Sequence, residues 1–233
     1  MVESPEVLTR RALLFTGVTV AAATLAGCTS RTLIGQGEDT PSRAAVAPRP
    51  AAPLAASPTP PVPPAIAPTL LTGALAALER HSRMVRYRDR VAIVDFDAPS
   101  AQPRMHVLDI ESGKVTRFLV AHGAGSDPGH TGFLQRFSNR HGSNASSEGA
   151  YVTSNYYVGK HGRSQRLIGL DPTNNNALER AIVVHGAWYA NPDMVPAHGK
   201  LGRSQGCFAV GERALSDVFA LLGEGRMIYA ARA

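Results

Sequence analysis

Residues 202–210 have the sequence GRSQGCFAV, and they contain Cys207, the only cysteine beyond the first 28 residues. Upstream, residues 181–186 form the apolar run AIVVHG, which places His185 at the end of an expected strand. A thiol directly after a glycine, with an imidazole leaving a strand, is the combination that a cysteine nucleophile and its general base require. The two stretches therefore predict a catalytic centre built on strands.

Two further residues of this stretch suit such a centre. Arg203 could lower the pKa of the Cys207 thiol or hold a substrate carboxylate. Gly206 lets backbone N–H groups approach a reacting carbonyl, as an oxyanion hole needs. Non-catalytic interpretations stay open: an inert buried cysteine, a core histidine at 185 and a solvated charge at 203.

The rest of the chain predicts a β-rich fold with few helices. Apolar spacing predicts helices over residues 70–87 and 215–222. A polar, glycine-rich stretch at 122–149 is expected to be a functional loop. Strands are expected at residues 91–96, 105–110, 115–120, 150–153, 156–158, 181–184 and 227–229.

The first 28 residues are typical of an export signal rather than of a folded element. An arginine pair at 10–11 precedes an apolar segment, which ends in LAGC at residues 25–28. This end resembles a bacterial lipobox, in which Cys28 becomes the lipidated first residue of the mature protein. An uncleaved membrane anchor is the alternative, and the export route, twin-arginine or general, stays open. With lipid on Cys28, Cys207 has no disulfide partner.

Residues 29–69 are expected to be a disordered linker, and residues 70–233 a single catalytic domain. Ten prolines fall between residues 41 and 68, and such a composition cannot build a core. The net charge of +6 is spread along the chain, without the run of basic residues that marks a nucleic-acid tail. We therefore expect no nucleic-acid partner.

Taken together, residues 90–230 resemble the murein L,D-transpeptidase catalytic domain. Gln205 stands where the better-studied branch of that family has a histidine, and Phe208 stands where a proline is usual. The matching stretches are VAHG at 120–123, FSN at 137–139, GKHG at 159–162, RLIGL at 166–170, VHGA at 184–187 and GKLGRSQGC at 199–207.

The resemblance implies a β-sandwich-like domain and a two-step acyl transfer without metal or cofactor. Cys207 would form a thioester with a peptidoglycan tetrapeptide stem, release D-alanine, and pass the acyl group to a diaminopimelate amine. His185 would be the base, and the N–H groups of Gly206 and Cys207 would form the oxyanion hole.

For substrate contacts, the resemblance favours a wall made of Arg203, Ser204, Tyr157 and His161. It further implies an exported monomer in the cell envelope, lipid-anchored to a membrane through Cys28, with peptidoglycan stem peptides as its partners.

Three other functions compete with this interpretation. An L,D-carboxypeptidase or amidohydrolase would use the same thioester with water as acceptor. A zinc hydrolase would use His185, His198 and Cys207, with His161 as a further ligand, although the spacing matches no short zinc motif. A non-catalytic wall-binding lipoprotein would retain its function after Cys207→Ala.

Overall fold

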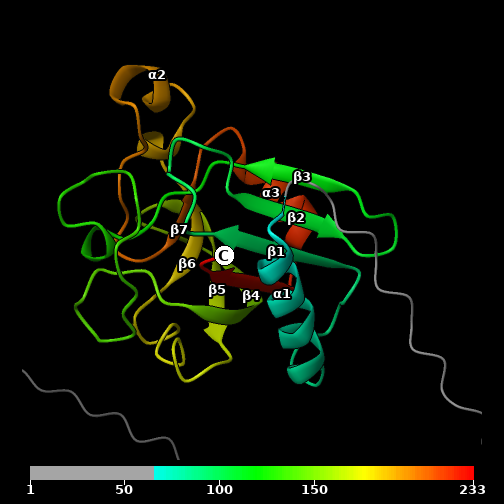
Figure 1. The fold of residues 1–233 in the computed structure, drawn as a ribbon. Coiled ribbons are helices and arrows are strands. Elements are labelled where there is room, and N and C mark those ends of the chain that lie inside the picture. The colour runs from blue at the N-terminus through cyan, green and yellow to red at the C-terminus, as the bar shows by residue number, and fades with distance from the viewer. Residues whose placement is uncertain (1–65) are drawn as a thin grey trace, which may run out of the picture. The chain divides into compact units, whose positions relative to one another are not determined.

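The computed structural model describes residues 66–233 (Figure 1). The predicted leader with Cys28, and the linker up to residue 65, lie outside the described residues. Within residues 66–233, no helix is both long and apolar enough to cross a membrane.

The described chain is mainly β structure with three α-helices, which confirms the predicted β-rich class. Its elements are α1 (Pro68–Arg80), β1 (Arg90–Asp95), β2 (Met105–Asp109), β3 (Val115–Phe118), the 3₁₀ turn η1 (Ala124–Ser126), β4 (Gly149–Gly159), β5 (Gly162–Gly169), β6 (Val183–Gly186), the 3₁₀ turn η2 (Trp188–Ala190), α2 (Met194–His198), β7 (Phe208–Val210), α3 (Leu215–Leu222) and β8 (Met227–Ala231).

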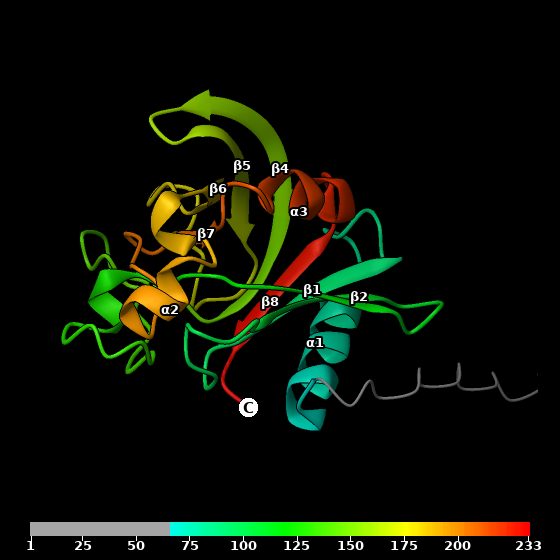
Figure 2. The same cartoon turned by 90° about the horizontal axis from the view of Figure 1, so that it is seen from above.

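All eight strands belong to one sheet, in the order β3-β2-β1-β8-β4-β5-β6-β7. The pairs β1–β8 and β6–β7 are parallel, and the other pairs are antiparallel. The chain that follows β3 bridges β7 through Ala121 and Ala209, so the two edges of the sheet meet. The two layers expected of a sandwich are therefore parts of one sheet that curls round on itself (Figure 2).

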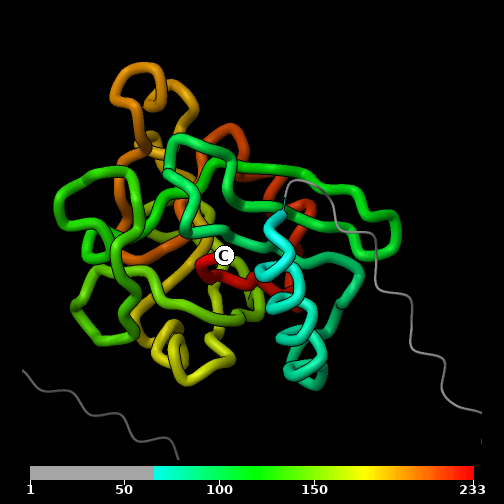
Figure 3. Tube along the Cα trace, viewed as in Figure 1, coloured from blue at the N-terminus to red at the C-terminus, as the bar shows by residue number. Residues whose placement is uncertain are grey.

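The two faces of the sheet carry separate apolar clusters. The inner cluster joins side chains of all eight strands and of α3, with Phe208 of β7 in edge-to-face contact with Tyr151 of β4 at 5.3 Å. The outer cluster packs α1 against β1 and β8. Figure 3 shows α1 and β8, which are far apart in the sequence, side by side. Burial on both faces explains why the central strands are nearly continuous apolar runs rather than alternating ones.

Several predicted boundaries need correction. The first helix begins at Pro68, within the predicted linker, since proline is tolerated in the first helical turn. It ends at Arg80 rather than at residue 87, because residues 81–84 form a turn that still buries Val85. The runs 150–153 and 156–158 are one strand, β4, with an irregular register between Thr153 and Tyr156. The strands β5 and β7 and the helix α2 were not predicted.

Candidate active site

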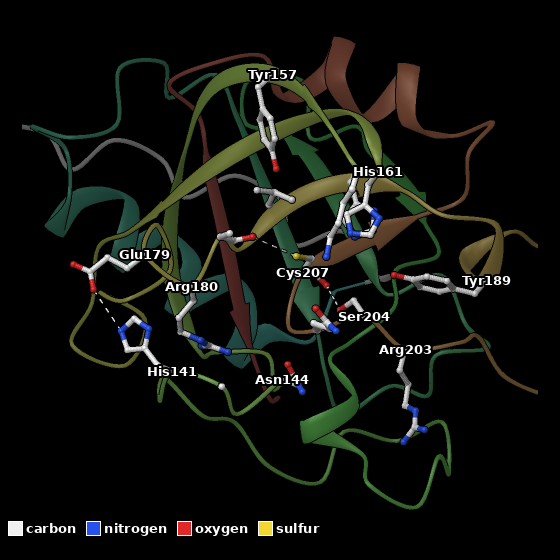
Figure 4. A pocket seen from close by; sticks show the side chains of 16 residues that line it. His141, Asn144, Tyr157, His161, Glu179, Arg180, Tyr189, Arg203, Ser204 and Cys207 are labelled. Atoms are coloured by element: carbon white, nitrogen blue, oxygen red, sulfur yellow. Dashed lines mark hydrogen bonds and ion pairs between the residues drawn. The ribbon is translucent and has the colours of Figure 1, made fainter. Parts of the chain in front are cut away.

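A cavity of about 550 Å³ opens where the hairpin end of β4 and β5 overhangs β6 and β7 (Figure 4). It holds both predicted catalytic side chains. Its walls come from the 122–149 loop, the end of β4 with the β4–β5 turn, the segment before β6, β6 itself, η2, and residues 203–207. The lining residues are His141, Gly142, Asn144, Tyr157, Lys160, His161, Glu179, Arg180, Ala181, Val183, His185, Tyr189, Arg203, Ser204, Gln205 and Cys207.

The parallel pairing of β6 and β7 brings His185 and Cys207 together. Phe208 pairs with Val184 and points into the core, so the residues that alternate with these two face the other way. His185 pairs with Ala209. Cys207 lies two residues before Ala209 and therefore on the same face of the sheet. The imidazole on β6 and the thiol directly before β7 are therefore diagonal neighbours, and both line one cavity.

The imidazole of His185 has a fixed tautomer. Its Nδ1 lies 2.9 Å from the backbone oxygen of Gly186, and a carbonyl oxygen only accepts, so Nδ1 carries the hydrogen. The free Nε2 lone pair is then available for the thiol proton. The ring of His161 stacks on that of His185 with centroids 4.2 Å apart and 19° between planes, which covers one face of the base.

At pH 7, before substrate binds, both the His185 imidazole and the Cys207 thiol are neutral. Burial lowers the pKa of His185, the hydrogen bond to Gly186 opposes this, and His161 and Lys160 lower the pKa further. Burial raises the pKa of the Cys207 thiol, against a hydrogen bond from Val183 and the charges of Lys160 and Arg180. The thiol contacts the carbonyl oxygen of Ala181 at 3.6 Å. This arrangement suits a base that accepts the proton during attack rather than a standing thiolate–imidazolium pair.

The turn that presents Cys207 is braced from inside by Ser204, which is buried. The Ser204 hydroxyl donates to the backbone oxygen of Cys207 at 2.7 Å and accepts from the Gly206 N–H at 3.1 Å. The Gly206 N–H, predicted as an oxyanion donor, is therefore engaged within the protein. Ser204, predicted as a substrate contact, has both of its hydrogen bonds inside the turn.

Gly206 is required by its backbone conformation and its surroundings. Its backbone φ angle is 109°, a value that residues other than glycine rarely adopt. A Cβ atom at this position would lie 2.6 Å from the backbone oxygen of Ala145.

The turn rests on a buried charge network that the sequence did not reveal. Arg104 donates to Nδ1 of His122 at 2.8 Å, and His122 Nε2 lies 3.3 Å from the Asp127 carboxylate. Burial, together with Arg104, lowers the pKa of His122 to about 4. The backbone oxygen of His122 accepts from the Ser204 N–H, and the adjacent Gly123 bridges Ser204. The network thus holds the platform beneath the nucleophile.

All four predicted wall residues line the cavity, and the three besides Ser204 differ in orientation. Tyr157 lies above Cys207 with its hydroxyl directed into the cavity (Figure 4), and the Arg166 guanidinium lies 4.0 Å from its ring centroid. His161 covers His185. Arg203 points away from Cys207, and its guanidinium donates to the backbone oxygens of Asp127 and Pro128. The charges that lower the thiol pKa are those of Lys160 and Arg180, and the predicted influence of Arg203 is not among them.

The structure shows whether Phe208 shapes the cavity and whether His198 lies close enough to His185 and Cys207 to share a metal ion. Phe208 is buried in the core and does not line the cavity, so it does not shape the substrate pocket. His198 lies exposed at the end of α2, outside the cavity that holds His185 and Cys207. Within residues 66–233, no three His, Cys, Asp or Glu side chains gather as a metal site would require.

Comparison with known proteins gives one family match. The model of the L,D-transpeptidase catalytic domain family matches residues 63–231. No curated protein matches the chain.

Among solved structures, the chain is similar to an L,D-transpeptidase from Mycobacterium smegmatis, with 12% identity, a TM-score of 0.38 and coverage of 61% of this chain and 58% of that one. The LD transpeptidase LdtMt1 in complex with imipenem gives 12% identity, a TM-score of 0.38 and coverage of 61% and 59%. The helical cell shape determining protein Pgp2 from Campylobacter jejuni gives 15% identity, a TM-score of 0.40 and coverage of 66% and 53%. The chain thus spans between 53% and 59% of the length of these structures.

Proposed function

Because the chain belongs to the L,D-transpeptidase catalytic domain family, we propose that it cross-links bacterial peptidoglycan by acyl transfer through Cys207. The observation that carries the proposal is the β6–β7 pairing, which directs His185 and Cys207 into one cavity. The Nδ1–Gly186 hydrogen bond supports it, because it leaves Nε2 free as a base.

The first step forms a thioester. His185 Nε2 takes the proton of the Cys207 thiol as the sulfur attacks the carbonyl between diaminopimelate and the terminal D-alanine of a tetrapeptide stem. The carbon–nitrogen bond then breaks, and the leaving D-alanine amine takes the proton from His185. The enzyme is left with an acyl group on sulfur and a neutral imidazole.

The second step transfers the acyl group. An amine of a second stem attacks the thioester carbonyl and gives a proton to His185. The carbon–sulfur bond breaks, and the sulfur recovers the proton from His185. An acceptor amine must reach the cavity unprotonated, which a neutral His185 base favours.

The charges of the cavity fit an anionic peptide. Three cationic side chains, Lys160, Arg180 and Arg203, line it with a single carboxylate, Glu179. A peptidoglycan stem carries several carboxylates, and guanidinium and ammonium groups attract them. Tyr157 and His161 stand over the reactive pair and complete the wall on the side of the β4–β5 hairpin.

The setting we propose for this chemistry is the cell envelope. The leader with its LAGC end would place lipid on Cys28, and the proline-rich residues 29–69 would hold the catalytic domain away from the membrane. We propose that the protein acts there as a monomer.

The test is intact mass spectrometry of the full-length protein with a carbapenem, and then with a disaccharide tetrapeptide. We expect a covalent carbapenem adduct that maps to Cys207, followed by loss of D-alanine from the tetrapeptide and formation of a cross-linked dimer. Cys207→Ala abolishes both results. His185→Ala keeps the cysteine but acylates far more slowly.

The product decides among the remaining activities. A tripeptide in place of the dimer identifies a carboxypeptidase that uses water. An unmodified, folded protein with a free thiol and unchanged peptide refutes the proposed chemistry.

A further inference from the structure

We infer that Arg180 is a positioning residue for the nucleophile: its fixed charge stabilises the Cys207 thiolate, and its hydrogen bonds hold the loop that walls the cavity. The inference deepens the proposed function, because it rests on Cys207 being the nucleophile of the same site. Arg180 lies in the irregular segment between β5 and β6, and no motif of the sequence points to it.

The guanidinium of Arg180 is held on both terminal nitrogens. One donates to the Ser138 backbone oxygen at 2.8 Å and to the Ser147 hydroxyl at 2.5 Å. The other donates to the Ser143 hydroxyl at 3.2 Å and to the Ala145 backbone oxygen at 2.5 Å. The side chain is therefore fixed, and residues 138–147 are tied to the segment that leads into β6.

Arg180 also lies directly beside the turn of the nucleophile. One of its terminal nitrogens would be 3.2 Å from a Cβ built on Gly206, the residue before Cys207. The next residue in the chain, Ala181, provides the carbonyl oxygen that contacts the thiol at 3.6 Å. Figure 4 shows the Arg180 side chain directed toward this part of the cavity.

The charge of Arg180 is not cancelled by a neighbour. All four of its hydrogen-bond acceptors are neutral oxygens, and within residues 66–233 no carboxylate forms an ion pair with it. Its neighbour Glu179 pairs with His141 instead. A cation that is half-buried and unpaired acts strongly on a nearby anion, because little water or salt screens it.

The other groups around the sulfur do not supply an equivalent fixed charge. Lys160, from the β4–β5 turn, lowers the pKa of the Cys207 thiol more than Arg180 does in this arrangement, but its side chain is exposed, so water and salt screen its charge more strongly. His185 and His161 are neutral at pH 7, because burial lowers the pKa of both imidazoles. Burial, and after it the negative charge that Cys207 carries when ionised, raises the pKa of Tyr189 to about 12, so the Tyr189 phenol is neutral and supplies no positive charge. Arg180 is thus the fixed cation of the site.

The experiment measures the pH profile of iodoacetamide alkylation at Cys207 in the full-length protein, with the modified cysteine located by peptide mapping. For Arg180→Gln we expect alkylation on the order of tenfold slower at pH 7, with rates that converge on those of the wild type at high pH. Arg180→Lys keeps the charge and should retain most of the wild-type rate at pH 7.

Control variants separate the charge from the loop. Ser143→Ala and Ser147→Ala weaken the loop contacts without removing the charge, and should leave the pH profile unshifted. Arg136→Gln removes an arginine that also donates to a loop carbonyl, at 2.9 Å to Gly125, but does not line the cavity, and should match the wild type.

An unchanged alkylation profile in folded Arg180→Gln overturns the inference, and so does a rate that falls equally at every pH. If Arg180→Gln does not fold, Arg180→Lys decides: a tenfold loss at pH 7 overturns the inference. Alkylation needs no peptidoglycan, so a protein that shows the shift but forms no thioester refutes the proposed function and leaves the role of Arg180 standing.

Discussion

The substitution Ser204→Ala separates two roles for the same hydroxyl group. By resemblance to its family, Ser204 is expected to contact the substrate. In the structure its hydroxyl is buried and joins the Gly206 N–H to the Cys207 carbonyl, as an internal brace of the nucleophile turn. The two roles predict different kinetic and thermal results.

The expected cost follows from the two hydrogen bonds, at 2.7 and 3.1 Å. Each such bond contributes about 0.5–1.5 kcal/mol net, and more where a buried partner is left unsatisfied, so we expect a loss of about 2 kcal/mol. For a domain of this size each kcal/mol lowers Tm by about 2–4 °C, which gives a decrease of about 4–8 °C.

The assay combines thermal unfolding with acylation by the tetrapeptide stem. A brace holds the sulfur in attack geometry, so Ser204→Ala should lower kcat and leave KM nearly unchanged. Ser100→Ala is the matched control, because Ser100 is equally buried and accepts one hydrogen bond, from the Leu201 N–H at 3.1 Å. It should cost about half as much stability and leave kcat unchanged.

The opposite pattern would refute this reasoning. If Ser204→Ala raises KM and leaves both kcat and Tm at wild-type values, the hydroxyl contacts the substrate and does not brace the turn.

Three further results are expected. Gly206→Ala should cost about 3 kcal/mol or more in a urea titration, since its φ is 109° and its Cβ would meet backbone, whereas Gly162→Ala, with φ of 70° and open space, should cost about 1 kcal/mol; equal losses would contradict the tight packing around Gly206. Stability should fall by about 3 kcal/mol or more between pH 6.5 and pH 4, because the folded state keeps His122 neutral down to about pH 4 while the unfolded chain takes up the proton near pH 6.5, and His106, His161 and His185, whose pKa values are also lowered, add to the loss. Urea unfolding at both pH values measures this, and a flat profile would argue against it. The acylation rate should rise with pH below 6.5 and be level near pH 7, because burial lowers the pKa of the His185 base; a rise centred above pH 7 in the mass-spectrometric assay would show that ionisation of Cys207, rather than the base, limits attack.

The sequence predicts the elements of this fold where local pattern and tertiary burial agree. The runs at 91–96 and 105–110 are strands because β-branched and apolar residues there are buried on both faces. The strand β5 was missed because its first half, residues 162–165, is polar and begins with glycine. The strand β7 has only three residues, and it exists because β6 and the Ala121 bridge lie on either side of it.

The site shows the same division. Cys207 and His185 are visible in sequence because each reactive residue follows a local feature, a glycine turn or the end of an apolar strand. Arg180 acts through contacts with residues 33 to 42 positions away, and His122, although it lies in the matching stretch at 120–123, takes its role from Arg104, 18 positions away; no local pattern encodes either set of contacts. Arg203, only four residues before the cysteine, was the natural sequence candidate for the activating charge, but the backbone directs it to the other side of the turn.

The neutral state of the reactive pair has a consequence for the compartment that we propose. The thiolate, rather than the thiol, is the form of cysteine that is oxidised. Burial raises the pKa of Cys207 and so keeps the resting nucleophile protonated, while the charges of Lys160 and Arg180 limit that rise. His185 then needs to remove the proton only when a carbonyl is in place to receive the sulfur. In the cell envelope, where we propose that the protein acts, a cysteine held in this way would be protected between turnovers and would remain within reach of activation when the proposed peptide is bound.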